Sequence, residues 1–220
     1  MLQASTIKFL RDLKKNNNKP WFEKNKDVYL NAREDIGNLA GQVIEKLGRT
    51  DTDIAPLQAK DCLYRIYRDV RFSKDKTPYK NNIGAFLNKG GKKAPTAGYY
   101  FQCAPGRNIA GGGLWMPPAP DLNKVRQEID YNFDEWRKIV EGKAFKKLFP
   151  QGMEQEDVLS RPPKGYDAEN PAIEYLKLKS FVVIRHFTDQ EMQSRTLTKE
   201  IVKTFETMHP FIRFLNRSLE

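Results

Sequence analysis

The sequence is poor in the residues that most often build metal centres and disulfide frameworks. Its 220 residues contain two cysteines, Cys62 and Cys103, and two histidines, His186 and His209. These four are scattered and lack the spacing of zinc ligands, so no metal site is predicted. Both cysteines lie in apolar, strand-like surroundings, and we therefore expect two buried thiols that are not linked to each other.

Other absences narrow the classes of reaction. No Gly-x-Ser-x-Gly elbow occurs, and neither cysteine has a histidine near it in the sequence, so nothing supports nucleophilic catalysis. No stretch approaches the ~18 apolar residues that a membrane span needs, and the first residues lack the apolar core of a signal peptide. We therefore expect a soluble, cytoplasmic protein that does not engage a membrane.

What the sequence does contain is positive charge. Lysine and arginine number 38 against 28 aspartates and glutamates, which gives a net charge of +10. Such a balance favours encounter with nucleic acid, anionic metabolites or acidic partners, although net charge alone does not specify a mechanism. Hydrophobic residues make up 39% of the chain, which is typical of a globular protein.

Hydrophobic periodicity predicts helices near both ends of the chain and strands between them. Apolar residues keep three-to-four spacing along one long helix from Pro20 to Gly48 and again from Ile201 to Leu219. Short runs rich in aromatic and β-branched residues between Cys62 and Met116 are typical of antiparallel strands, and Ser180–Phe187 adds another. We expect residues 1–220 to form a single α+β domain with a largely antiparallel sheet flanked by helices.

The stretch "YRIYRDVRFSKDKTPYK" at residues 64–80 begins as a strand and ends as a turn. A buried arginine without a partner costs several kcal/mol, so each arginine here needs a carboxylate, a sheet margin or a ligand. Guanidinium forks and mobile lysines suit phosphate or carboxylate groups. The alternative is a solvated turn closed by weak ion pairs. The predicted ligand-binding residues of this stretch are Arg65, Arg68, Asp69, Arg71, Lys74, Asp75, Lys76, Tyr79 and Lys80.

Different roles are expected within that stretch. Val70 and Phe72 are apolar and should anchor the turn to the core. Arg68 should pair with a protein group, whereas Arg71 should keep donors free for a ligand. If the protein is an enzyme, Asp69 or Asp75 is the candidate general base, but each of them can also simply orient an arginine.

Three consecutive glycines at residues 111–113 form a second feature of interest. The following Leu-Trp-Met replaces the Lys and Ser or Thr of a P-loop. Glycines in a strand allow close backbone approach, either by a neighbouring element or by a ligand. They form a bulge against packed aromatics, or the floor of a pocket walled by Tyr100 and Trp115. In the second case Gly112, Gly113 and Trp115 belong to the binding site. His186, at a strand end, is a candidate acid or base, although a structural histidine is favoured.

Several stretches together resemble a known family. "FLRDLKKNNNKPWFEKNKDVY", "RIYRDVRFSKDKTPYKNNIGAF", "GYYFQCAPG", "GGGLWMP" and "RPPKGYD" occur in order along nearly the whole chain. They resemble the bacterial family catalogued as domain of unknown function 2461, and Arg68–Lys80 is the most specific part. The resemblance implies a single, usually cytosolic family domain and carries over no reaction.

The leading hypothesis is a cytosolic protein that binds a phosphate-bearing ligand, a nucleotide or nucleic acid, at a basic pocket floored by the glycines. The catalytic residues, the cofactor and the oligomeric state are left open. The alternative is a noncatalytic interaction module whose basic face docks an acidic protein. A pocket would favour a small ligand, a flat basic stripe with exposed aromatics would favour single-stranded nucleic acid, and a flat apolar patch would favour a protein.

Overall fold

A four-stranded sheet lies at the centre of the computed structural model, which describes residues 1–220. All its neighbouring strands are antiparallel, in the order β1-β2-β3-β4. The strands are β1 (Ile83–Leu87), β2 (Gly98–Cys103), β3 (Asn108–Leu114) and β4 (Phe181–Phe187). The predicted α+β class and the largely antiparallel sheet are confirmed.

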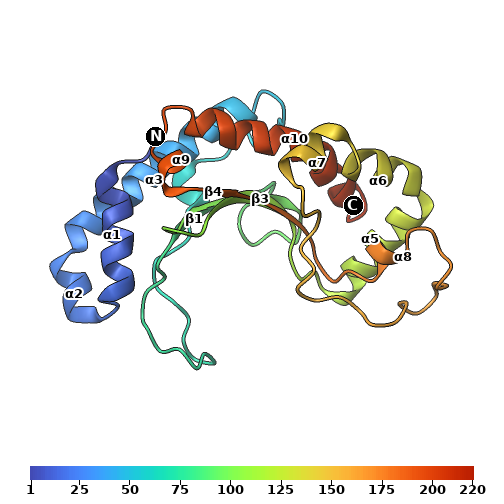
Figure 1. Cartoon of the computed structure of the whole chain (residues 1–220), viewed down its shortest axis with the longest axis horizontal. Helices are drawn as coiled ribbons and strands as arrows, with labels where there is room; N and C mark the ends of the chain where they lie inside the picture. Colours follow the sequence, from blue (N-terminus) through green and yellow to red (C-terminus); the bar gives the residue numbers. More distant parts are fainter.

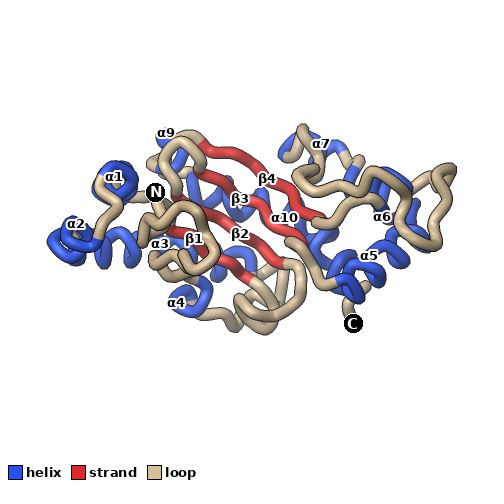
Figure 2. The backbone as a smooth tube through the Cα atoms, turned by 90° about the horizontal axis from the view of Figure 1, so that it is seen from below, coloured by secondary structure: helices blue, strands red, loops and turns tan.

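Two long helices cover one face of this sheet. They are α3 (Lys26–Leu47) and α10 (Leu197–Arg217), and the apolar positions of both helices are buried. Their partners on the sheet include Leu87, Tyr99 and Phe101, whose side chains are fully buried. Figure 2 looks onto the opposite face, where no helix lies across the strands. The sheet therefore has a covered face and an open face.

Smaller helices form a lobe at each end of the sheet (Figure 1). One lobe contains α1 (Ala4–Lys15) and α2 (Lys19–Lys24), and the other contains α5 (Ala119–Tyr131), α6 (Phe133–Val140), α7 (Lys143–Leu148) and α8 (Ile173–Leu176). The short helices α4 (Ala59–Cys62) and α9 (Asp189–Met192) flank the sheet. The whole molecule has the shape of an arch, and the open face of the sheet is the underside of that arch (Figure 1).

The predicted single helix from Pro20 to Gly48 is interrupted. Asn18 caps α2 by accepting a hydrogen bond from the backbone N–H of Trp21. Asn25 ends it, because its side-chain amide donates to the Trp21 carbonyl oxygen at 2.8 Å. The chain then restarts as α3, so α2 can pack in a separate direction against the N-terminal helix.

The expected strand from Cys62 to Arg68 was wrong. Cys62 ends α4, Leu63 bridges to Ala85 of β1, and the backbone N–H of Tyr64 donates to the Gly84 carbonyl at 3.0 Å. The chain then leaves the sheet and pairs with itself: the backbone N–H of Lys80 donates to the Ile66 carbonyl, and that of Arg68 donates to the Pro78 carbonyl. We call residues 64–80 the basic arm, which hangs from the arch in Figure 1.

Both cysteines are buried free thiols, as expected. Burial raises the pKa of Cys103 to about 12, so this thiol stays protonated at neutral pH. None of the helices combines the length and the apolar character needed to cross a membrane.

Candidate functional site

The open face of the sheet holds a trough of about 520 Å³. Gly111, Gly112 and Gly113 of β3 line its floor, beside Val182 and Ile184 of β4. Its aromatic wall residues are Tyr64, Phe86, Tyr100 and Trp115. The glycines thus line a pocket between Tyr100 and Trp115, one of the two arrangements that the sequence left open.

The three glycines keep regular pairing and form no bulge, since Gly111 lies opposite Tyr100 on one side and Ile184 on the other. A side chain here would collide with a neighbouring strand. A Cβ atom on Gly111 would lie 2.1 Å from the Val183 carbonyl oxygen, and one on Gly113 would lie 1.9 Å from that of Phe181. Gly113 also has a φ of +129°, which other residues rarely adopt. Glycine is therefore required at these positions for the strands to pair, and the absence of side chains also leaves the floor of the trough open.

The aromatic wall combines flat apolar rings with one fixed hydroxyl. Tyr100 and Tyr64 meet edge to face with their ring centroids 6.2 Å apart. The Tyr100 hydroxyl donates to Gln102 Oε1 at 2.8 Å, and Asn82 Nδ2 donates to the same oxygen at 2.6 Å. Burial raises the pKa of Tyr100 to about 12, so the phenol stays neutral. Trp115, 62% exposed, offers a ring at the trough's margin.

Two lysines stand at the rim of the trough beside Tyr64. Lys80 Nζ is 5.2 Å and Lys92 Nζ is 5.8 Å from the centroid of the Tyr64 ring. Lys92 also donates to the Leu63 carbonyl oxygen at 2.6 Å. Burial and the nearby Arg65 lower the pKa of Lys80. Neither ammonium group pairs with a carboxylate; the lysines that do are Lys8, Lys89, Lys177 and Lys179.

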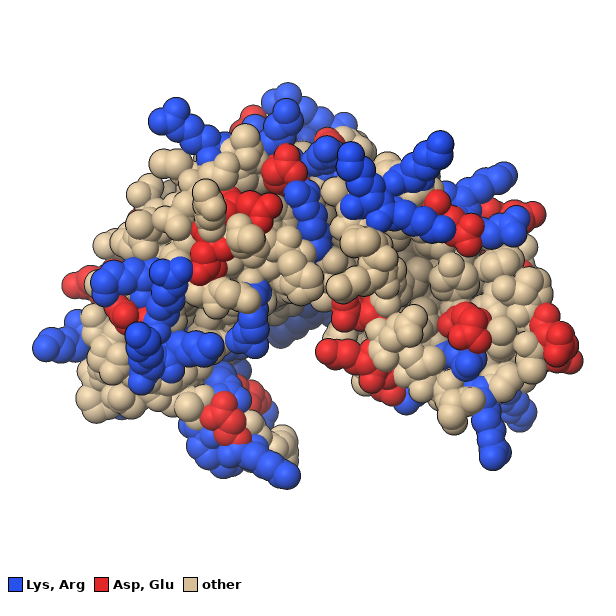
Figure 3. Space-filling model, viewed as in Figure 1, with Lys and Arg blue, Asp and Glu red and all other residues tan.

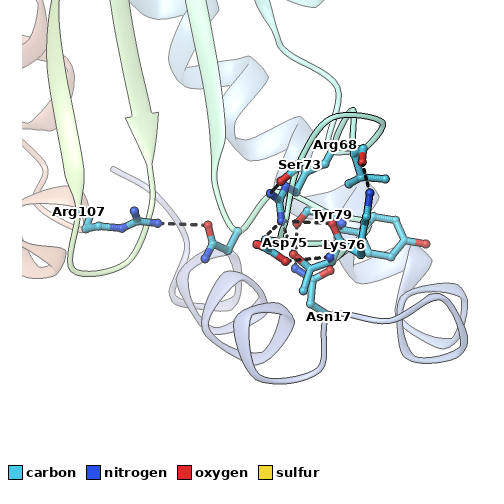
Figure 4. A network of polar contacts seen from close by, with 10 residues as sticks. Asn17, Arg68, Ser73, Asp75, Lys76, Tyr79 and Arg107 are labelled. Carbon is cyan, nitrogen blue, oxygen red and sulfur yellow. Dashed lines mark hydrogen bonds and ion pairs between the residues drawn. The ribbon is translucent and has the colours of Figure 1, made fainter. Parts of the chain in front are cut away.

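The stem of the basic arm is anchored on the N-terminal lobe (Figure 4). Tyr79 is buried and stacks on Phe22 of α2 with ring centroids 4.0 Å apart, and Tyr67 packs beside both. Asn17 accepts from the backbone N–H of Tyr79 at 3.0 Å and donates to its carbonyl at 2.8 Å. Arg107, from the turn between β2 and β3, donates to Asn81 at the foot of the arm. The stem is therefore held from two sides.

Arg68 closes the arm internally, as predicted for a structural role. Its guanidinium donates to Asp75 and to the hydroxyl of Thr77, and it donates to Ser73 Oγ at 3.3 Å (Figure 4). The backbone N–H of Thr77 and the Arg68 guanidinium lower the pKa of Asp75 to about 2. A carboxylate so stabilised as an anion is a weak base, so its role here is to orient the arm.

The tip of the arm differs from the prediction. Arg71 lies on the exposed tip, where its Nε and Nη2 donate to Asp69 at 3.0 and 2.7 Å, instead of keeping those donors free. These bonds lower the pKa of Asp69. Phe72 is 97% exposed, so the expectation that it anchors the turn to the core was wrong. The Asp69–Arg71 pair closes a local turn that leaves the ring of Phe72 outside.

The structure thus divides the predicted site residues into two groups. Gly112, Gly113 and Trp115 line the trough, and Lys80 joins them at the rim. The other predicted residues lie along the arm and not in the lining of the trough: Arg65, Arg68, Asp69, Arg71, Lys74, Asp75, Lys76 and Tyr79. Tyr64 and Lys92 were missed as trough residues, although "GGKKAP" marked a basic hairpin next to the strands. His186 is exposed at the end of β4.

A second polar cluster lies on the covered face and was not predicted. The Tyr99 hydroxyl donates to Asp51 Oδ2 at 2.7 Å and lies 3.0 Å from His209 Nδ1. Asp51 also accepts from the backbone N–H of Asp53 at 3.1 Å. Burial and the Asp51 carboxylate raise the pKa of Tyr99. These contacts tie the segment after α3 to β2 and α10.

Comparison with known proteins identifies the family but adds no activity. A family model described as "Conserved hypothetical protein (DUF2461)" matches residues 5–214, in agreement with the resemblance seen in the sequence. No curated protein and no solved structure matches the chain.

Proposed function

The chain belongs to the family of conserved hypothetical proteins DUF2461, and from the trough on its sheet we propose that it binds a phosphate-bearing ligand, a nucleotide or nucleic acid. A base lies over the glycine floor between the aromatic walls. The phosphate meets Lys80 and Lys92 at the rim. The binding surface is the open face of the sheet.

One observation carries this proposal: two partly buried ammonium groups without a carboxylate partner stand at the rim of an aromatic trough. Lys80 and Lys92 flank the same Tyr64 ring, and Arg65 places a further positive charge near Lys80. Removing such charges from water costs free energy, and the lowered pKa of Lys80 reflects that cost. A bound phosphate would supply the missing counter-charge, whereas an uncharged ligand would leave both ammonium groups without one.

The floor and walls suit the flat part of such a ligand. The glycines let a planar group approach the backbone of β3, and the rings of Tyr100 and Trp115 provide surfaces for stacking or edge contact. The volume of about 520 Å³ falls in the range of small-molecule sites, which run from roughly 300 to 1,000 Å³. The trough is recessed, which suits a base. A docked protein would instead need a flat apolar patch.

Trp115 provides a direct optical test. Nucleoside triphosphates should quench its fluorescence, because its exposed ring borders the trough. Trp136 is buried and Trp21 lies on α2 outside the trough lining, so neither should respond. The Trp115→Phe variant should lose the quenching but still bind in calorimetry. Lys92→Met should weaken binding about tenfold, because one charge-assisted contact contributes roughly 1.5 kcal/mol.

Lys138→Met is the matched control, since it removes the same charge from α6, outside the trough. Its affinity should equal that of the unmodified protein. Equal affinity for the Lys92→Met variant, or no nucleotide binding by the unmodified protein at any salt concentration, would overturn the proposal.

A further inference from the structure

The tip of the basic arm carries an aromatic ring that the proposed trough does not use. Phe72 is 97% exposed, the highest value among the large hydrophobic residues, and the Arg71 guanidinium lies 5.9 Å from its ring centroid. The stem below it is fixed by Tyr79, Phe22 and Asn17. The ring is therefore presented to solvent on a supported stem.

The arm also keeps an excess of unpaired positive charge. Both of its carboxylates are engaged within the arm, Asp69 by Arg71 and Asp75 by Arg68. Its four other basic residues form no ion pair: Arg65, Lys74, Lys76 and Lys80. An anionic ligand on the arm would therefore displace no existing ion pair of these residues.

This positive surface extends beyond the arm. The arm contacts α2 through Phe22 and the turn before it through Asn17. Helices α1 and α2 add exposed lysines that form no ion pair either: Lys14, Lys15, Lys19 and Lys24. Figure 3 shows basic side chains over the arm and the adjoining lobe, while acidic side chains gather on the facing rim of the arch. The charge therefore favours a ligand that leaves the trough on the side of the arm.

We propose that the ligand is a single-stranded nucleic acid rather than a free nucleotide. This inference rests on the proposed function: one base occupies the trough, the phosphates follow the basic arm, and a further base stacks on Phe72. Aromatic platforms combined with a positive track are the usual means of binding single strands, with sites of roughly 4–16 nucleotides.

The shape of the molecule favours an unpaired strand over two other anionic partners. The bases of a duplex are stacked inside it and cannot reach rings recessed in a trough. A membrane surface would require a larger apolar area than one exposed ring, and Phe72 is accompanied at the tip by Asp69, Arg71 and Lys74. The rings of Tyr64 and Tyr100 also line the recessed trough, where a flat surface cannot reach them.

Fluorescence anisotropy with labelled oligothymidylates of increasing length tests this inference. Affinity should rise with length until the strand spans trough and arm. Phe72→Ala should weaken binding of the longer strands by roughly 5- to 160-fold, the range for one lost base–aromatic stack. It should leave thymidine nucleotide binding unchanged. Lys74→Met should lower the slope of log affinity against log salt by about 0.7, the contribution of one phosphate contact in a single strand.

Tyr131→Ala is the matched control, because Tyr131 is a similarly exposed aromatic residue at the end of α5. It should bind every oligonucleotide like the unmodified protein. Affinity that does not change with length, or that does not respond to Phe72→Ala, would overturn this inference while nucleotide binding in the trough still stands. Phe72-dependent binding to phosphatidylserine vesicles, with no oligonucleotide binding, would overturn it in favour of a membrane. If neither the unmodified protein nor any of the variants bound a mononucleotide, that result would instead count against the proposed function.

Discussion

The two faces of the sheet differ most clearly at two neighbouring residues. Tyr99 points to the covered face, where it is fully buried and its hydroxyl lies between Asp51 and His209. Tyr100 points to the open face, where its ring forms part of the trough and its hydroxyl contacts Gln102. Alternation along β2 places the same residue type in two environments.

The difference teaches how to separate a structural polar group from a binding one. On the covered face, the buried Tyr99 hydroxyl finds its partners in Asp51 and His209, from two other parts of the chain. On the open face, the two lysines beside Tyr64 find no carboxylate. Removing the Tyr99 hydroxyl on the covered face should therefore lower the free energy of unfolding. Removing a lysine on the open face should lower the affinity for the proposed ligand.

The largest effect should come from the glycine strand that both faces share. Gly113→Ala places a Cβ 1.9 Å from the Phe181 carbonyl oxygen at a φ of +129°. It should lower the free energy of unfolding by about 3 kcal/mol, which is the upper end of the usual cost of a strained backbone position. Urea denaturation measures this change. Gly91→Ala is the control, since it shares a positive φ but its Cβ meets no atom within 4 Å. Equal costs at the two positions would show that collision with β4 is not the cause.

Tyr99→Phe should come next. It removes the donor to a buried carboxylate and should lower the free energy of unfolding by about 1–3 kcal/mol. Tyr100→Phe should cost less than about 1 kcal/mol, because Gln102 Oε1 still accepts from Asn82. Thermal or chemical denaturation of both variants measures the contrast between the faces. If the two variants lost similar amounts of unfolding free energy, the two faces would not differ in the way described.

Lys80→Met should separate binding from stability. The variant should bind a nucleotide about tenfold more weakly, which corresponds to roughly 1.4 kcal/mol. Its melting temperature should stay the same or rise slightly, since burial and Arg65 disfavour the charged amine. Calorimetry and thermal unfolding on the same sample test this. A lower melting temperature with unchanged affinity would assign Lys80 a structural role.

The smallest expected effect is a change of affinity with pH. The pKa of Lys80 lies below its ordinary value of 10.5, and a bound phosphate would raise it. Binding should therefore take up protons, and affinity should fall as pH rises from neutrality through that lowered pKa. Lys80→Arg should flatten the alkaline loss, because the guanidinium stays charged there. An identical pH profile in the variant would exclude Lys80 as the titrating group.

Much of the fold could be predicted because each strand carries its own signal. Runs of aromatic and β-branched residues located the four strands, and helical spacing located α3 and α10. The segment from Cys62 to Arg68 was wrongly predicted as a strand of the sheet, because its residues alternate as they do in a strand. Its charged residues instead pair across the arm. Asn25 was overlooked because one side-chain hydrogen bond ends α2 without a change in hydrophobic pattern.

The lining of the trough, which is only a candidate site, was predicted in part, for a related reason. Gly112, Gly113 and Trp115 were identified because unusual residues in a strand stand out in sequence. Lys92 reaches Tyr64 only because the hairpin folds back beside the arm, and the Asp51–Tyr99–His209 cluster joins three distant segments. The exposure of Phe72 depends on where a turn closes, which hydrophobicity does not reveal.

Nuclear magnetic resonance titration of the isotopically labelled protein with a nucleoside triphosphate tests the central claim most directly, because it reports on both faces at once. The backbone amide signals of Gly111, Gly112 and Gly113 should shift together with that of Lys92, while those of Asp51 and His209 should stay in place. Shifts confined to the covered face, or no shift among the three glycines at saturating ligand, would contradict the claim that the open face of the sheet is the binding surface.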